Sequence, residues 1–290
     1  MKKWQLLLVV IVAGLLTAQA QAGVINVLWY TGGVVQGTPG TYETNINTLA
    51  ALAPGAPGGN TWNVTFWDSG AMPTPTDGPF NVVVLASPQG GWATYPVYTA
   101  FNDAGLTFDP TVQRLMLTGQ DADWHYQNGA PLPTTFDGPQ GFLLDSINWA
   151  GSGTGLGLVD LGQTGLCGPD ATLGLGGYTP LCSNSTDNVQ IPGTEALFPI
   201  NTNLTSAGLS GWGESAHVEF TGLSVDWNGI NVDGNLTDCG DPAGGKCDYV
   251  TIVSASSVGG GIGGTPEPSS LLLFGTGLVG LIRYRRSWLR

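Results

Sequence analysis

Four short apolar runs, each ending at glycine or a polar turn, constrain the fold of this chain more than any other feature. They are Val24–Tyr30, Phe80–Ala86, Arg114–Thr118 and Gly157–Leu161. Their continuous apolar character, without alternation, is typical of strands that are covered on both faces. The segments between them include stretches with helical spacing, at Tyr42–Ala53, Tyr95–Ala104 and Gly141–Ala150, and an alternating strand at Thr61–Trp67. Strands that alternate with helices predict an α/β fold with a mostly parallel sheet.

The second half of the chain has a different character. Residues 162–188 are rich in glycine, and short strands are predicted at His217–Thr221 and Tyr249–Ser254. The predicted fold is therefore an α/β domain with a mostly parallel sheet and a β-rich second half. The alternative is an all-β sandwich. The helical spacing of Tyr42–Ala53 is the main argument against the sandwich.

The first 22 residues have the parts of a secretory signal peptide in the right order. Lys2 and Lys3 precede the apolar stretch Leu6–Leu16, which is short for a membrane span, and Ala20-Gln21-Ala22 is a cleavage site of the A-x-A type. We therefore expect passage through the secretion machinery and cleavage by signal peptidase before Gly23. The mature domain is predicted to span residues 23–258, followed by a glycine-rich linker at 259–265.

The C-terminal segment 266–290 combines three features. Pro266-Glu267-Pro268 comes first, residues 269–282 are apolar, and a basic end follows with Arg283, Arg285, Arg286 and Arg290. An apolar stretch that halts in a membrane, with arginines that hold its end in the cytoplasm, is a stop-transfer element.

This tail closely resembles the PEP-CTERM sorting signal. The resemblance implies recognition by an exosortase, which is a membrane cysteine peptidase, and transient contact with the inner membrane through residues 269–284 before the tail is removed. It also implies a bacterium that makes an extracellular polysaccharide, and a location at the cell surface or in the extracellular matrix.

Charge is distributed very unevenly along the chain. The whole chain has a formal net charge of −13, but six of its eight basic residues lie in the two terminal segments. Between residues 23 and 265 only Arg114 and Lys246 are basic, against twenty carboxylates, which gives that body a net charge of −18. This charge argues against nucleic acid as a partner, because phosphate binding needs Lys and Arg. It suits solubility outside the cell and attraction for divalent cations.

The chain has four cysteines, at Cys167, Cys182, Cys239 and Cys247. Export would place them in an oxidising compartment, where disulfides form and persist. Their spacing favours Cys167–Cys182 and Cys239–Cys247, although four cysteines allow three connectivities. The spacing lacks the close pairs that a structural zinc site needs.

The order of elements in the body resembles the class I glutamine-amidotransferase-like fold, a flavodoxin-like sheet that includes ThuA-like proteins. The stretches that support the likeness are VLWYTGG, FNVVVLASP, RLMLTGQDADWH and GWGESAHVEF. In active members a cysteine follows a central strand and a late H-x-E supplies the base. Here the corresponding turn is Gly119-Gln120-Asp121, which has no cysteine, while His217-Val218-Glu219 keeps the H-x-E spacing. The resemblance implies a flavodoxin-like sheet in the body. Because this sequence departs from the family at the nucleophile, we do not expect the amidotransferase activity of the family from this domain.

The densest polar and aromatic cluster follows the strand Arg114–Thr118. It contains Asp121, Asp123, Trp124 and His125, which could hold a metal ion or grip a sugar through carboxylate hydrogen bonds and aromatic stacking. Because ligands of open α/β sheets bind at the carboxyl ends of strands, we expect this cluster to meet residues 31–33 and 87–92 there. The alternative is a structural turn whose aspartates cap a helix and whose tryptophan is packed.

Two further groups are candidates. His217 and Glu219 alternate along a predicted strand and would share a face, which Glu214 could join, although a structural histidine explains the pattern as well. A second segment is rich in oxygen ligands suited to Ca²⁺, although turn formation accounts for it equally; it comprises Asp226, Asn228, Asn231, Asp233 and Asn235.

The sequence as a whole favours an exported, non-catalytic surface or matrix protein that binds a ligand such as carbohydrate, with Ca²⁺ as the one cofactor to consider. The alternative is a secreted hydrolase or carbohydrate-active enzyme that uses the Asp121/Asp123/His125 and His217/Glu219 groups. This alternative requires the two groups to meet in one hydrogen-bonded network.

Overall fold

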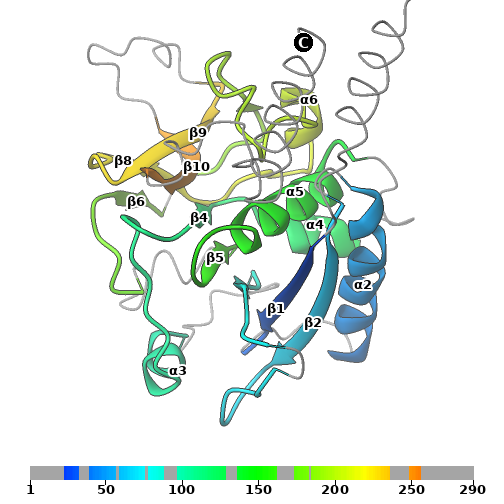
Figure 1. The fold of residues 1–290 in the computed structure, drawn as a ribbon. Coiled ribbons are helices and arrows are strands. Elements are labelled where there is room, and N and C mark those ends of the chain that lie inside the picture. The colour runs from blue at the N-terminus through cyan, green and yellow to red at the C-terminus, as the bar shows by residue number, and fades with distance from the viewer. Residues whose placement is uncertain are drawn as a thin grey trace, which may run out of the picture. The chain divides into compact units, whose positions relative to one another are not determined.

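The four apolar runs form neighbouring strands of one sheet in the computed structural model (Figure 1). The structure describes residues 23–32, 39–56, 59–75, 78–87, 97–128, 136–161, 173–182, 184–235 and 248–255. All of them belong to one unit, Met1–Ser256, and the sorting tail belongs to a second unit, Ser257–Arg290, outside the described residues. The signal peptide predicted at residues 1–22 lies outside them as well.

The described residues form ten strands and several helices. The strands are β1 (Val24–Tyr30), β2 (Thr61–Trp67), β3 (Val82–Leu85), β4 (Leu115–Thr118), β5 (Gly157–Asp160), β6 (Thr179–Leu181), β7 (Val189–Gln190), β8 (Glu219–Thr221), β9 (Trp227–Asp233) and β10 (Tyr249–Ser254). The helices are α2 (Pro39–Leu52), the 3-10 turn η1 (Ala53–Gly55), α3 (Val97–Asp103), α4 (Ala122–Asn128), α5 (Pro139–Gly151) and α6 (Ser206–Leu209).

The strands join one sheet that is parallel at one end and antiparallel at the other. The spatial order is β2-β1-β3-β5-β4-β10-β8-β6, and β9 pairs with both β10 and β7. The neighbours from β2 to β4 are parallel, whereas every pairing that involves β6 to β10 is antiparallel. This mixed α/β architecture confirms the predicted fold class, with a β-rich second half.

The strand order differs from a flavodoxin-like sheet. In that arrangement the fourth strand lies beside the third and the fifth lies outside it. Here β5 lies between β3 and β4 and pairs in parallel with both. The connection that contains α3 therefore passes over the position that β5 later occupies.

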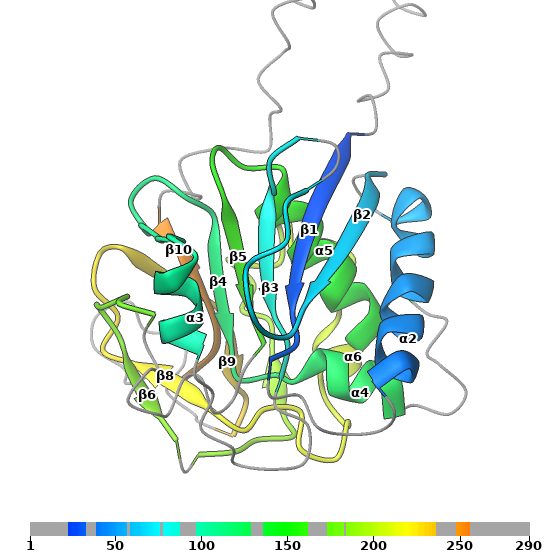
Figure 2. The same ribbon diagram turned by 90° about the horizontal axis from the view of Figure 1, so that it is seen from below.

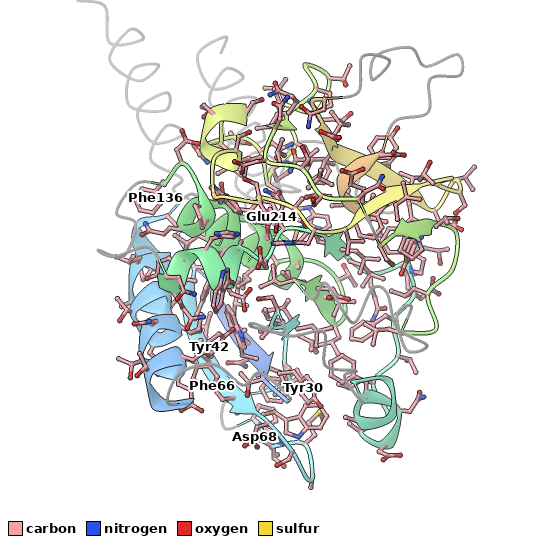
Figure 3. The ribbon with its side chains drawn as sticks, turned by 180° about the vertical axis from the view of Figure 1, so that it is seen from behind. Tyr30, Tyr42, Phe66, Asp68, Phe136 and Glu214 are labelled. Carbon is pink, nitrogen blue, oxygen red and sulfur yellow. The ribbon has the colours of Figure 1, made fainter. Side chains whose placement is uncertain are left out.

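Helices cover both faces of the parallel half, which explains why its strands are apolar without alternation (Figure 2). One face packs against α2, α4 and α5 through residues such as Val27, Trp29 and Val84. The other packs around Leu28 and Tyr30, and around Phe101 of α3. Figure 3 marks Tyr30 on β1 and Tyr42 on α2, which belong to these two separate clusters. Two covered faces also exclude the all-β sandwich alternative.

Helix α2 is amphipathic, as its spacing predicted. Tyr42, Ile46 and Leu49 are buried at helical spacing against the sheet. The helix begins three residues before the predicted start and ends at Leu52, one residue short of the predicted end. Pro54 explains the end, because a proline disfavours helical backbone at the residue before it.

Helix α5 is the central helix, and every residue from Gln140 to Gly151 is buried. It packs on β1, β3, β4 and β5 and also against α4 and α6. Buried polar groups on it therefore need partners within the protein. Asn148 has one, because its Oδ1 accepts a hydrogen bond of 2.8 Å from Trp62 Nε1. In contrast, Oδ2 of Asp145 accepts no hydrogen bond among the described residues.

The predicted disulfides mostly involve residues outside the described part of the chain. Cys182, directly after β6, is disulfide-bonded. Cys167, Cys239 and Cys247 lie outside the described residues, so the pairing stays a prediction. In the described part of the chain no helix has the length and apolarity needed to cross a membrane. The apolar stretch 269–284 lies outside that part.

A backbone contact at Gly119 joins the parallel half to the antiparallel half. Its N–H donates to the carbonyl of Val250 at 3.0 Å, and its carbonyl accepts from the N–H of His217 at 3.0 Å. A Cβ at this position would meet the backbone of Val218. Only glycine allows the turn after β4 to approach the segment before β8 this closely.

We expect Gly119→Ala to destabilise the fold, because the added methyl group must displace the Val218 backbone. The expected loss in the free energy of unfolding is about 1–3 kcal/mol, typical of an overpacked site. Gly40→Ala in α2 is the matched control, since a Cβ there meets open space. Urea unfolding of both variants measures the difference, and equal stability of the two would contradict the packing argument.

Asp145 predicts a pH-dependent stability. Burial raises the pKa of its carboxyl to about 7, while its hydrogen bond with Asn203 opposes the rise. Between about pH 4 and pH 7 the folded state keeps a proton that the unfolded chain has lost, so stability decreases as pH rises through this window.

The side chain of the Asp145→Asn variant cannot ionise. We expect the free energy of unfolding of this variant to exceed that of the wild type by roughly 2–4 kcal/mol at pH 8. The difference should vanish near pH 4. Unfolding curves at several pH values measure it, with the exposed Asp103→Asn as the control for loss of a charge. A difference that does not change with pH would show that Asp145 is not the titrating group.

Candidate functional site

The turn after β4 and the helix α4 that follows it carry the first two residues of the candidate site. Asp121 directly precedes α4, and its carbonyl accepts the N–H of His125 at 3.1 Å. Residues four apart in a helical turn lie on the same face. Nε2 of His125 consequently lies 3.0 Å from Oδ1 of Asp121.

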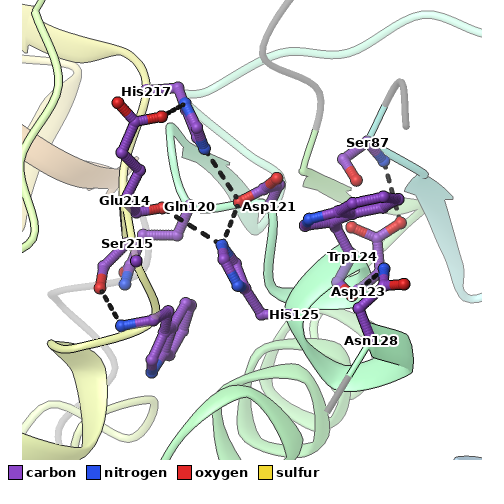
Figure 4. Close-up of polar contacts among 12 residues, drawn as sticks. Ser87, Gln120, Asp121, Asp123, Trp124, His125, Asn128, Glu214, Ser215 and His217 are labelled. Carbon is purple, nitrogen blue, oxygen red and sulfur yellow. Dashed lines mark hydrogen bonds and ion pairs between the residues drawn. The ribbon is translucent and has the colours of Figure 1, made fainter. Parts of the chain in front are cut away.

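His217 brings a third side chain to the same carboxylate (Figure 4). Its backbone N–H is held by the Gly119 carbonyl, and its Nε2 lies 3.6 Å from Oδ1 of Asp121. Asp121, His125 and His217 each offer one ligand atom, and these three atoms lie within 4.8 Å of one another. The predicted clusters around Asp121 and His217 therefore meet in one site.

Glu214 contacts both histidines. Its Oε2 lies 3.2 Å from Nδ1 of His217, and its backbone carbonyl lies 3.2 Å from Nε2 of His125. The backbone of Glu214 has a φ of 127°, a region that residues with a side chain rarely adopt. Strained backbone of this kind costs of the order of 1–3 kcal/mol and persists where the surroundings hold it in place.

The loop that carries Glu214 is held by Asp187. One carboxylate oxygen of Asp187 accepts hydrogen bonds from the N–H groups of Gly213 and Glu214, at 3.2 and 3.4 Å, and from Oγ of Ser215 at 2.6 Å. Burial raises the pKa of Asp187, but the Ser215 hydroxyl and the loop amides outweigh burial and lower it overall. The charged carboxylate therefore fixes the loop at neutral pH.

The site is shielded but open to solvent. The exposed fractions of the side chains are 10% for Asp121, 14% for His125 and 22% for His217, so water or a small ligand reaches the group. Burial lowers the pKa of His125. The carboxylate of Asp121 and the carbonyl of Glu214 outweigh burial, and the net direction is upward.

Asp123 points away from this site and into the core. Its Oδ2 accepts hydrogen bonds from the Tyr42 hydroxyl at 2.8 Å and from the Ser87 N–H at 3.0 Å. Tyr42 in turn accepts one from Trp29 Nε1 at 2.9 Å. Burial raises the pKa of Asp123 to about 6, against the opposing hydrogen bonds of Ser87 and Tyr42. The structure thus separates Asp123 from Asp121, with which the sequence had grouped it.

The aromatic residue beside the histidines is Trp212, which the sequence analysis did not single out. Its ring centroid lies 5.3 Å from that of His125, and its Nε1 donates to the Gly208 carbonyl at 2.8 Å. Trp124 is partly exposed and lies on the Ser87 side of α4, apart from His125 (Figure 4). The glycines around Trp212, in the stretch GWGES, were the available signal for a tight turn at this position.

Glu219 does not share a face with His217. It is the first residue of β8, is 1% exposed, and its Oε2 accepts a hydrogen bond of 3.1 Å from Asn184. The bend at His217 explains the difference, because strand alternation begins only with β8. Burial raises the pKa of Glu219.

The segment considered for Ca²⁺ is the strand β9 rather than a loop. Asp226 precedes the strand and Asp233 ends it, so that roughly 20 Å of extended chain separates them. Oδ1 of Asp233 instead accepts hydrogen bonds from the Thr186 hydroxyl at 2.7 Å and from the Asn235 N–H at 2.9 Å. The oxygen atoms of this segment are therefore spread along a strand instead of surrounding one point.

Comparison with known proteins identifies only the tail. Residues 265–286 match the family model described as the PEP-CTERM protein-sorting motif, which includes the Pro266-Glu267-Pro268 sequence. No curated protein and no solved structure matches the chain. The chain therefore carries a PEP-CTERM sorting motif at its end, and the resemblance of the body to ThuA-like proteins has no support from these comparisons.

Proposed function

We propose that this chain is exported, that an exosortase recognises its tail, and that the processed protein is located at the cell surface or in the extracellular matrix. The observation that carries this proposal is the sorting motif at residues 265–286. Its apolar stretch halts in the inner membrane while Arg283, Arg285 and Arg286 hold its end on the cytoplasmic side. Cleavage beside Pro266-Glu267-Pro268 then releases the body from the membrane.

The charge of the body supports an extracellular location. A net charge of −18 between residues 23 and 265 keeps the domain soluble and makes it a poor ligand for nucleic acid. Signal peptidase would remove residues 1–22 on the way. The two charged ends, which carry most of the basic residues, are both lost in the mature form.

We further propose that the displayed domain binds a carbohydrate of the extracellular polysaccharide without catalysing a reaction. Two partly exposed tryptophans lie near the end of β4. Trp212 packs 5.3 Å from the ring of His125, and Trp124 lies on the Ser87 side of α4, one turn from the Asp121 carboxylate in sequence. Aromatic faces stack on the apolar faces of sugars, and carboxylates accept hydrogen bonds from hydroxyl groups. The turn Gly119-Gln120-Asp121 offers no thiol for amidotransferase chemistry.

A secreted hydrolase is the second candidate, and one observation favours it. Asp121, His125, His217 and Glu214 form one continuous network, which is the arrangement that an acid–base site requires. Ligand binding and turnover on the same polysaccharide distinguish the two candidates.

Sorting predicts two cleavages. Mass spectrometry of the protein from its native host should find a mature form that begins at Gly23 and lacks the tail, and a host without exosortase should retain the tail. Replacing Pro266, Glu267 and Pro268 by alanine should have the same effect as loss of the exosortase. Alanine at Ser269 and Ser270 is the control. Untrimmed protein in the cytosol of the normal host would contradict the proposal.

If the domain binds carbohydrate, replacing either tryptophan should lower its affinity for polysaccharide. We expect Trp124→Ala and Trp212→Ala each to weaken binding of the full chain to polysaccharide from the host matrix by roughly tenfold, which corresponds to one lost stacking contact. Trp→Phe at the same positions keeps an aromatic face and should retain binding. Release of sugar fragments, abolished by His217→Ala, would instead establish the hydrolase.

A further inference from the structure

His125 and His217 are the only two histidines in the chain. They come from distant parts of the sequence, one from α4 and one from the segment before β8. Nevertheless, both direct Nε2 at the same carboxylate oxygen, Oδ1 of Asp121, at 3.0 and 3.6 Å. The fold thus gathers every imidazole that the protein has around a single atom.

Buried carboxylate oxygens usually accept hydrogen bonds, and Oδ1 of Asp121 is an exception within the described structure. Oδ1 of Asp121 is buried and accepts no hydrogen bond of acceptable geometry among the described residues, although two ring nitrogens are close. Nε2 of His125 also lies 3.2 Å from the Glu214 carbonyl, so a proton on this nitrogen would be divided between two acceptors. A metal ion would take the place of that proton, with the ring proton kept on Nδ1. A buried carboxylate oxygen with two ring nitrogens close by and no well-formed hydrogen bond to the described residues is a suitable ligand for a bound ion.

The spacing of the three atoms fits a shared metal ion. Bonds of about 2.0–2.2 Å from a tetrahedral ion to nitrogen and oxygen place neighbouring ligand atoms roughly 3.4 Å apart. The two distances to Oδ1 of Asp121, 3.0 and 3.6 Å, lie on either side of that separation. No two of the three ligand atoms are more than 4.8 Å apart, so each pair lies within about 1.4 Å of the separation that a shared ion requires.

Glu214 prepares His217 for this role. Its carboxylate lies 3.2 Å from Nδ1 of His217, which places the ring proton on Nδ1 and leaves the lone pair of Nε2 free to face Asp121. The arrangement of carboxylate, imidazole and metal recurs in metal sites because it fixes both the tautomer and the ring orientation. The backbone of Glu214, which the Asp187 carboxylate holds at a φ of 127°, directs its side chain to this contact.

The electrostatic surroundings favour a cation. The body has only two basic residues against twenty carboxylates. One of them, Arg114, precedes β4 at the opposite end of the strand, where it donates to the Trp149 carbonyl at 2.9 Å. Among the described residues, a positive ion at the site would therefore experience the field of Asp121, Asp123 and Glu214 with little opposition.

We propose that Asp121, His125 and His217 bind one divalent transition-metal ion, and that zinc is the ion best matched to these donors. Two imidazole nitrogens favour zinc and related metals over Ca²⁺, which prefers oxygen ligands. Three protein ligands leave one position of a tetrahedral zinc ion for water or a bound molecule. The proposal depends neither on the sorting tail nor on carbohydrate binding.

Zinc binding is measured on the full chain, purified in detergent with a tag that contains no histidine and stripped of metal with a chelator. Calorimetric titration with zinc chloride should give one ion per chain. His125→Gln and His217→Gln should each lose this binding. Glu214→Gln should weaken it by roughly 10–100-fold, as expected for a group that orients a ligand. Asp103→Asn, on the exposed surface of α3, should bind as the wild type does.

Two further measurements separate loss of binding from loss of folding. Thermal unfolding without metal should give similar midpoints for the wild type and the histidine variants, and zinc should raise only that of the wild type. Nitrogen NMR of histidine-labelled wild-type protein shows two rings, and zinc should shift both. Three results would overturn the proposal. The first is that the wild type takes up no stoichiometric zinc, the second is that zinc uptake survives both histidine changes, and the third is that Ca²⁺ binds as tightly as zinc.

Discussion

The site depends on one close backbone approach, between Gly119 at the end of β4 and the segment that precedes β8. Two hydrogen bonds of 3.0 Å tie Gly119 to Val250 on one side and to His217 on the other. The missing side chain lets the turn rest against the Val218 backbone. Because this contact joins the parallel strands to the antiparallel ones, it also brings His217 to the end of β4, where Asp121 and His125 lie.

Two aspartates separated by one residue illustrate how strongly burial determines function. Asp121, which is 7% exposed as a whole residue, faces the two partly exposed histidines, whereas Asp123 is fully buried and accepts hydrogen bonds from Tyr42 and Ser87. The second interaction connects α4 to α2 and to the end of β3, and it fixes the helix that presents His125. Asp123 therefore supports the site through the core and does not contact its histidines in the described structure.

The loop with Glu214 combines strain with charge. An unfavourable φ is maintained by hydrogen bonds from the loop to the Asp187 carboxylate, and the result is that Glu214 reaches both histidines. Strained backbone of this kind, which lowers the stability of the folded state, is common at functional sites. The loop belongs to a chain whose sorting motif at residues 265–286 indicates export.

The sequence by itself determined the C-terminal sorting motif, the fold class and most of the parallel strands. The strands β1, β2 and β10 have the predicted bounds. Local hydrophobic patterns indicate which residues of a strand are buried, and this information does not depend on distant parts of the chain. The sequence also singled out Asp121, His125 and His217. It could not place β5 between β3 and β4, turn Asp123 inward, direct Glu219 to Asn184 or reveal Trp212 and Asp187. These features depend on contacts between segments far apart in the chain, and only the packing of the complete sheet decides which segments meet.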